Sequence, residues 1–123
     1  MAKKKEVKTS QILSDVVIKG LQELKGENII NIDLTNIDNA VCDNFILCTG
    51  TSNTHVNSLA GSVEKEVRET INDRPWKKEG FGNSEWIILD YVNTVVHIFQ
   101  EEARNFYNLD GLWADAEITK IEE

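Results

Sequence analysis

The chain has 123 residues, a formal net charge of −8 and a pI near 4.8. This length suits one domain with enough apolar content to form a core without covalent staples. The acidic balance argues against a protein that holds nucleic acid by its phosphates, and it suits a basic protein partner.

The N-terminus holds the basic cluster of the sequence, formed by Lys3, Lys4, Lys5 and Lys8. No apolar run of the kind that a signal peptide needs follows this cluster. We therefore expect residues 1–9 to form a basic flexible tail on a cytoplasmic protein. No segment of the sequence approaches the length of a membrane span.

A first helix is expected from Ser10, which can cap it, to about Lys25, with Gly26 as the stop. The apolar residues of this helix form one stripe that can cover a sheet: Leu13, Val16, Val17, Leu21 and Leu24. Residues 28–34 alternate and predict a half-buried strand. Its two sides are Ile30, Ile32 and Leu34, and Ile29, Asn31 and Asp33.

The run Phe45–Thr49 is apolar without alternation, which predicts a central strand covered on both faces. It leads through the sequence T-G-T-S into a second helix that ends near Asn72. A glycine before a hydroxyl-rich helix start can hold an anion, but the glycine spacing and the lysine of a nucleotide loop are missing. Ser52 as an ordinary N-cap explains this turn better. The expected buried stripe is Val56, Leu59, Ala60, Val63, Val67 and Ile71.

Residues 86–100 carry the pattern of a β-hairpin, after an edge strand within Trp76–Phe81 and a turn at residues 80–84. Two runs rich in β-branched and aromatic residues flank a polar break at Val92 and Asn93. If these two residues form the loop, Tyr91 pairs with Thr94 and the ladder continues to the pair Trp86 and Phe99.

The alternation gives this hairpin two unlike faces. One face is apolar and belongs against a core: Ile87, Leu89, Tyr91, Val96 and Ile98. The other face mixes aromatic, acidic and imidazole groups: Trp86, Ile88, Asp90, Val95, His97 and Phe99. Helices can cover this second face, with Asp90 and His97 satisfying each other, or the face can bind another protein.

A short helix is expected over Glu101–Asn108, followed by apolar anchors in Leu109–Trp113 that would pin the C-terminus to the sheet. Residues 117–123 are expected to form a loose acidic C-terminus. No repeat or linker divides the chain. We therefore predict a single α/β domain over residues 10–116, with a mixed sheet of about five strands flanked by helices.

The two cysteines, Cys42 and Cys48, match no zinc or redox spacing and are predicted to be reduced packing residues. A metal site that combines them with His55 and His97 is the alternative, although these residues lack the spacing of a ligand set. We expect neither a metal nor a cofactor.

Three motifs carry a resemblance to a known family. They are D-N-F-I-L-C-T-G-T-S at Asp43–Ser52, W-I-I-L-D-Y-x-x-x-V-V-H-I-F-Q-E-E-A-R at Trp86–Arg104, and F-Y-x-L-D-x-L-W at Phe106–Trp113. Together and in this order they resemble the ribosomal silencing factor family, RsfS, also called Iojap-like. The resemblance implies a fold similar to nucleotidyltransferases without their activity. The sequence also lacks the paired metal-binding carboxylates that nucleotidyl transfer needs.

The resemblance implies a translational repressor that is not an enzyme and acts mainly under nutrient limitation. Such a factor would bind the large ribosomal subunit through ribosomal protein L-fourteen and sterically block its association with the small subunit. Trp86, Asp90 and His97 match the partner-binding region of the family, and the hairpin geometry adds three further candidates. These are Phe81, Ile88 and Phe99.

The hairpin loop departs from the family, whose members tend to carry Gly-Asp where this chain has Val92 and Asn93. Valine is poorly tolerated at positive φ, so we expect a type I turn with Asn93 left-handed. Such a turn would shift the register by one residue and would change which face Asp90 and His97 share.

Two further interpretations are compatible with the sequence. In an enzyme, Asp90 and His97 would act as a base and its orienting group while the turn Thr49–Ser52 held a phosphate, although a nucleophile is missing. In a self-associating module, the aromatic face would pair with a second copy in a homodimer, which agrees with the repressor hypothesis. A charged His97 that donates to the partner would make binding sensitive to pH.

Overall fold

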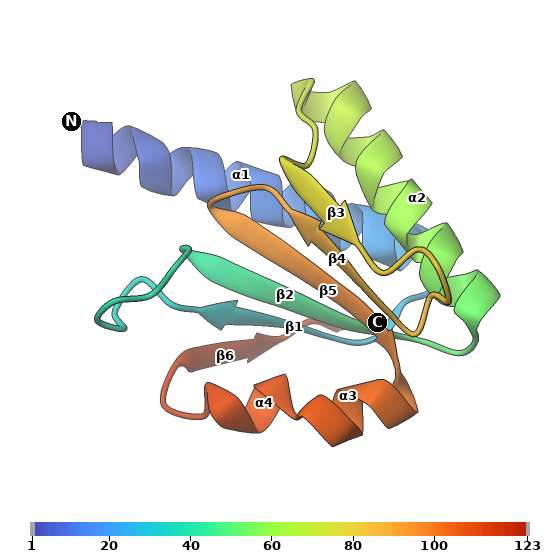
Figure 1. Ribbon diagram of the computed structural model, residues 1–123. Helices are drawn as coiled ribbons and strands as arrows, with labels where there is room; N and C mark the ends of the chain where they lie inside the picture. Colours follow the sequence, from blue (N-terminus) through green and yellow to red (C-terminus); the bar gives the residue numbers. More distant parts are fainter. Residues whose placement is uncertain (1, 123) are drawn as a thin grey trace.

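The computed structural model describes residues 2–122, which form one six-stranded mixed sheet with helices on both faces (Figure 1). The strand order is β3-β4-β5-β2-β1-β6, and β2 pairs with β5 in parallel while the other described pairs are antiparallel. The α/β class is confirmed, with six strands instead of about five. The elements are α1 (Ala2–Glu23), β1 (Glu27–Asp33), β2 (Asn44–Gly50), α2 (Asn53–Ile71), β3 (Lys77–Glu79), β4 (Trp86–Asp90), β5 (Thr94–Gln100), α3 (Glu101–Tyr107), α4 (Leu109–Leu112) and β6 (Glu117–Lys120).

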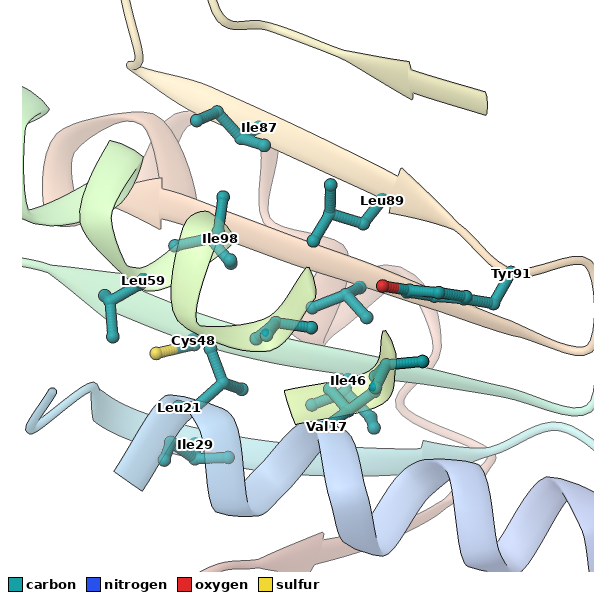
Figure 2. Close-up of a cluster of buried hydrophobic side chains, with 14 of the residues drawn as sticks. Val17, Leu21, Ile29, Ile46, Cys48, Leu59, Ile87, Leu89, Tyr91 and Ile98 are labelled. Carbon is teal, nitrogen blue, oxygen red and sulfur yellow. The ribbon is translucent and has the colours of Figure 1, made fainter. Parts of the chain in front are cut away.

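The first face of the sheet is buried under α1 and α2, where the larger core cluster lies. Figure 2 shows Ile87 and Ile98 from the hairpin converging with Leu21 of α1 and Leu59 of α2. The two helices touch closely at Gly20, where an added Cβ would lie 2.9 Å from the Cα of Val63. The predicted stripes of both helices and the apolar face of the hairpin are therefore confirmed as one core, with Ile71 partly buried at its margin. Leu24 is the exception: it follows the end of α1 and is 41 % exposed, so it does not belong to the buried stripe.

The second face carries a smaller core under the short helices α3 and α4 (Figure 1). Leu109 and Trp113 pack against this cluster, as the expected C-terminal anchors. The members that are fully or almost fully buried are Ile30, Ile32, Leu34, Phe45, Leu47 and Phe99. All seven residues of β2 are buried, which confirms that this strand is covered on both faces.

A buried polar network joins four elements at the start of β2. The amide nitrogen of Asn44 donates to Ser14 Oγ of α1 at 2.8 Å and to Asn31 Oδ1 of β1 at 2.9 Å. The amide oxygen of Asn44 accepts from Thr94 Oγ1 of β5 at 2.7 Å. Because one amide satisfies three partners, the network fixes the alignment of β1, β2 and β5 against α1.

Regular secondary structure extends further towards both termini than the sequence led us to expect. Helix α1 begins at Ala2 and not at Ser10, because the residues before Ser10 are mostly good helix formers. Residues 117–120 form β6, which pairs with β1, in place of the loose segment that was expected. The backbone groups on that edge of β1 need partners, and β6 supplies them. The ladder ends where the Ile121 N–H donates to the Ile29 carbonyl at 2.9 Å.

The hairpin register is confirmed, but the expected turn is wrong. The pairs Trp86 with Phe99 and Ile88 with His97 are present, and Tyr91 N–H donates to the Thr94 carbonyl at 2.9 Å. The residue with positive φ is Val92, at +75°, and not Asn93. Since the Asn93 N–H donates to the Tyr91 carbonyl at 2.9 Å, the loop is a classic γ-turn, which adds no residue and leaves the register unshifted.

Two sets of hydrogen bonds hold this strained turn. The carboxylate of Asp90 accepts from the Val92 N–H at 2.8 Å. The Asn93 carbonyl accepts from the N–H of Asp43 at 2.8 Å, and so ties the loop to the segment before β2. The surrounding structure thus imposes a conformation that a β-branched residue disfavours.

The substitution Val92→Gly is expected to raise the free energy of unfolding by about 1 kcal/mol, because glycine adopts positive φ without strain. Val92 is 58 % exposed, so little packing is lost. Urea unfolding followed by circular dichroism measures the change. The matched control is Val41→Gly, at a loop valine that is 84 % exposed and has no positive φ. Val41→Gly should leave stability unchanged or lower it slightly, and an equal loss in both variants would rule out strain at Val92.

Candidate functional site

The second face of the sheet is only partly covered, and one uncovered part lies on β4 and β5. We call this surface the Trp86 face and define it by Trp86, Ile88 and Asp90 of β4 and Val95 of β5. All four residues are half-buried, whereas Ile87 and Leu89 between them point into the core under α1 and α2. The strand alternation therefore presents a row of side chains that no helix fully covers.

Trp86 is held in a fixed orientation by three neighbouring rings. Its indole Nε1–H donates to Nδ1 of His97 at 3.1 Å. The centroid of its ring lies 5.5 Å from that of Phe99 below it and 4.6 Å from that of Tyr107 in α3. A large half-exposed aromatic ring that is already ordered loses little conformational freedom when it binds a partner.

His97 lies beneath the surface, and only 6 % of the residue is exposed. Because an indole N–H can only donate, Nδ1 of His97 accepts, and the proton of the neutral ring is on Nε2. Nε2 is buried without a hydrogen-bond partner among the described residues, and the ring meets Phe45 edge-on at 4.9 Å. Burial lowers the pKa of His97 to about 4, so the imidazole is neutral at physiological pH.

Asp90 and His97 do not form the pair that a base and its orienting group would need. The Asp90 carboxylate accepts from the backbone N–H of Val92, and His97 accepts from Trp86. The ladder sets His97 opposite Ile88 and sets Asp90 opposite Val95. Asp90 therefore shapes the loop, and His97 positions the indole ring.

Two expected members of this surface lie elsewhere. Phe99 is completely buried beneath Trp86, so it supports the ring from below and offers no atoms to a partner. Phe81 is 38 % exposed and lies 5.4 Å from the Lys78 ammonium. Since that ammonium bonds to Glu64 of α2 at 3.0 Å, Phe81 lies on the α2 side of the edge, away from Trp86. Residues in a turn do not follow the alternation of the strand that precedes them, which is why this expectation failed.

Arg104 of α3 clamps the small helices to the sheet. Its guanidinium makes a double hydrogen bond with the carboxylate of Asp110, at 3.2 and 2.9 Å. It also donates to the Asn28 carbonyl at 2.7 Å and to Thr49 Oγ1 at 2.9 Å. Only 8 % of Arg104 is exposed, and such a buried cation is tolerated because each of these contacts compensates for lost water.

This clamp places Tyr107 over Trp86 and extends the aromatic surface onto α3. Tyr107 is 53 % exposed, and Phe106 is 82 % exposed and meets Tyr107 at 5.0 Å. Sequence reasoning placed both residues in a short helix without assigning them to the site. The sequence pattern that could have identified them is the pair Arg104 and Asp110. A cation and an acid six residues apart can form an ion pair that fixes the segment between them, and this segment carries both rings.

The T-G-T-S turn is a helix cap, as predicted. Ser52 Oγ accepts from the His55 N–H at 3.1 Å. The His55 ring accepts from the Thr51 N–H at 2.9 Å and bridges to the Leu24 carbonyl at 2.7 Å. The N–H groups of Thr54, His55 and Val56 thus have partners within the protein.

Neither cysteine forms a disulfide, and neither has the surroundings of a reactive thiol. Cys48 is buried in the larger core. Burial also raises the pKa of Cys42 to about 11, which keeps its thiol protonated. Among the side chains that the structure describes, no three histidine, cysteine or acidic groups lie closely enough to hold a metal ion. Within residues 2–122, no helix has the length and apolarity to cross a membrane.

The sequence matches the family model described as "Ribosomal silencing factor during starvation", RsfS, over residues 7–123. It is 33 % identical to a ribosomal silencing factor RsfS of Haemophilus influenzae over 102 residues, covering 83 % of this chain and 98 % of that one. An RsfS protein of Bacillus subtilis is 32 % identical over 98 residues, covering 80 % and 81 % of the two chains. These names describe a regulatory protein and not an enzyme.

The fold is also similar to that of solved structures. A crystal structure of a protein from Chromobacterium violaceum superposes with a TM-score of 0.80 at 28 % identity, covering 92 % of each chain. A Bacillus halodurans protein has a TM-score of 0.75 at 26 % identity, covering 92 % of this chain and 99 % of that one. From the family match and these relatives, the chain belongs to the ribosomal silencing factor family, RsfS.

Proposed function

We propose that this protein represses translation by binding the large ribosomal subunit through ribosomal protein L-fourteen and blocking association with the small subunit. The repression would operate mainly under nutrient limitation, in the cytoplasm where ribosomes assemble. Membership of a family named for ribosome silencing during starvation supports this role. The observation that carries the proposal is the Trp86 face, a preorganised aromatic surface on a part of the sheet that no helix fully covers.

A steric block requires affinity and correct placement, and it requires no chemistry. A stable interface buries roughly 800 Å² on each partner, which is more than four half-buried side chains offer. The contact would therefore extend from the Trp86 face onto the exposed rings of Tyr107 and Phe106. Trp86 would be the central anchor, since interface energy concentrates in buried aromatic residues.

The charge of the protein favours a basic protein as the partner. A net charge of −8 accelerates encounter with a basic ribosomal protein and penalises stray contact with RNA. Asp90 lies within the Trp86 face and Glu101 and Glu102 are exposed on α3, so acidic groups accompany the aromatic surface. A homodimer formed through the same surface would compete with ribosome binding, because each copy would hide the other's Trp86.

Trp86→Ala is expected to weaken binding to isolated large subunits by about 30-fold or more, the loss typical of an interface anchor. Co-sedimentation measures the affinity. The matched control is Trp76→Ala. Trp76 is 73 % exposed, and the β3–β4 register places it opposite Tyr91, on the side of the sheet that faces α1 and α2.

Trp76→Ala should bind as the unaltered protein does, and equal affinity for Trp86→Ala would remove Trp86 from the site. Because Trp86 also packs within the protein, Ile88→Arg serves as a second variant that leaves the ring contacts in place. It sets a positive charge on the Trp86 face and should weaken binding to a basic partner while circular dichroism shows an intact fold.

The block itself is tested by adding small subunits to large subunits that already carry the protein. We expect the amount of whole ribosomes to fall as the protein is added, with the protein remaining on free large subunits in a sucrose gradient. Protein that sediments on whole ribosomes, with no loss of joining, would contradict a steric mechanism.

His97 should make the free energy of unfolding depend on pH, whereas the affinity for the large subunit should not depend on the protonation of His97. Its pKa is lowered to about 4 in the folded protein, so the unfolded state takes up a proton first, below its pKa of 6.5. The stability that His97 contributes is therefore present above pH 6.5 and is lost as pH falls towards 4, by about 1.4 kcal/mol per pH unit at most.

His97→Gln keeps an acceptor for the indole N–H but removes this proton uptake. The difference in unfolding free energy between the unaltered protein and this variant should shrink between pH 6.5 and 5. The ratio of their affinities for large subunits should stay flat from pH 5.5 to 8, because His97 is neutral throughout. A ratio that changes tenfold over this range would show instead that a charged His97 donates to the partner.

A further inference from the structure

The hairpin loop is strained at a residue whose side chain the loop does not use. Val92 has a φ of +75°. Three hydrogen bonds hold the loop, and they join its backbone to the Asp90 carboxylate, the Tyr91 carbonyl and the Asp43 N–H. Since none of these bonds involves the Val92 side chain, glycine could form the same turn without strain.

Valine is poorly suited to this conformation compared with the other residues that adopt it. Seven non-glycine residues have positive φ in the part of the chain that the structure describes, and four of them are asparagines. Asparagine tolerates this region because its short polar side chain can form local hydrogen bonds. Val92 is the β-branched member of the seven, and β-branched residues are the least tolerant of positive φ.

The Val92 side chain contributes little to the core of the isolated protein. It is 58 % exposed and belongs to neither of the two core clusters. Its isopropyl group therefore adds strain to the loop without a matching gain in apolar burial. Strain of this kind is common at binding sites, where the partner supplies the missing contact.

Val92 continues the Trp86 face in space. Strand β4 presents Trp86, Ile88 and Asp90 on that face, a row of roughly 14 Å at about 3.4 Å per residue. The Asp90 carboxylate accepts from the Val92 N–H at 2.8 Å, so Val92 adjoins the last member of the row. Figure 1 shows the β4–β5 loop at the end of the sheet, beside the start of β2. The loop thus lengthens a surface that is too small by itself for a stable interface.

The chemistry at this end of the surface fits a basic side chain of a partner. An exposed aliphatic group and the Asp90 carboxylate lie side by side here. Lysine and arginine combine a long aliphatic stem with a charged end, so the stem can pack on Val92 while the charge meets Asp90. This complementarity matches the basic partner that the net charge of −8 favours.

From the strain, the exposure and the position of this residue, we propose that Val92 is a further partner-binding residue, buried against a lysine or arginine stem of ribosomal protein L-fourteen. The inference rests on the proposed function, because it assumes that the Trp86 face docks on this protein. Val92 thereby destabilises the isolated protein and strengthens the complex. A substitution that relieves the strain should change stability and affinity in opposite directions.

The test compares two substitutions of Val92 with a matched control, by co-sedimentation with isolated large subunits. Val92→Gly removes both the side chain and the strain, whereas Val92→Ala removes two methyl groups and keeps a Cβ at positive φ. The control is Asn72→Gly. Asn72 is exposed, with a φ of +53° at the end of α2 on the helical side of the sheet, and glycine is favoured at such a helix end.

We expect Val92→Gly and Val92→Ala to bind large subunits about 10-fold more weakly than the unaltered protein, a loss typical of one buried aliphatic contact. Val92→Gly should at the same time unfold at a higher urea concentration. Asn72→Gly should bind as the unaltered protein does. Equal affinity for Val92→Ala and the unaltered protein would overturn the proposal, even with weak binding of Val92→Gly, because that loss would then come from loop flexibility alone.

Isolated ribosomal protein L-fourteen identifies the partner. Both Val92 variants should lose affinity for it by the same factor as for the large subunit. Undiminished binding to the isolated protein, together with a loss on the subunit, would overturn the assignment of the contact to this protein. Failure of the proposed function has a different signature, since the unaltered protein itself would then not bind large subunits.

Discussion

The guanidinium of Arg104 is the contact on which the second face of the sheet depends. Helices of seven and four residues have no stability of their own, so α3 and α4 exist because something holds them to the sheet. Arg104 does so by joining Asp110 of α4 to the backbone of Asn28 and the side chain of Thr49. Without this clamp the smaller core would face water, and Tyr107 would have no fixed place beside Trp86.

The Trp86 face exists because α3 and α4 are too short to cover the whole second face of the sheet. Two long helices bury the first-face side chains of β2, β4 and β5, whereas α3 and α4 pack over β1, β2 and part of β5. Trp86, Ile88 and Asp90 on β4 fall outside that cover and stay half-buried. Strand β4 thus contributes Ile87 and Leu89 to the larger core and, on its other side, carries most of the candidate binding surface. A partner that docks there completes the burial that the protein leaves unfinished.

Much of the fold could be predicted because side-chain alternation and residue type act over short range. The alternation of β4 and β5 was enough to give the register and to separate the core face from the Trp86 face. The unbroken apolar run of β2 identified the central strand, and Ser52 identified the start of α2. These features depend on neighbours in sequence or across one hairpin, so local patterns carry them.

The features that escaped prediction depend on distant contacts. The turn at Val92 is imposed by Asp90 and by the segment before β2, and valine itself would avoid it. β6 forms because β1 offers it an unpaired edge. The four residues of β6 are all exposed, so their sequence carries no pattern that predicts a strand. The burial of Phe99 depends on its contacts with Trp86 and with α3. The side of the sheet on which Phe81 lies depends on its contact with Lys78. For the candidate site, the sequence therefore placed Trp86 on the half-buried side of β4 but did not give the layers above and below it.

The position of β5 in the sheet has a consequence for the order in which the protein can fold. This strand lies between β4 and β2, and its partner β2 precedes it by a long stretch of chain that includes α2 and β3. Pairing over such a sequence distance is slow compared with the formation of a helix or hairpin. The clamp closes later still, because Arg104 and Asn28 are 76 residues apart. During synthesis, the surface around Trp86 therefore cannot be complete until the chain has emerged at least as far as Asp110, the partner of Arg104 in the clamp. A factor of this design gains the ability to silence a ribosome only after α4 has been translated.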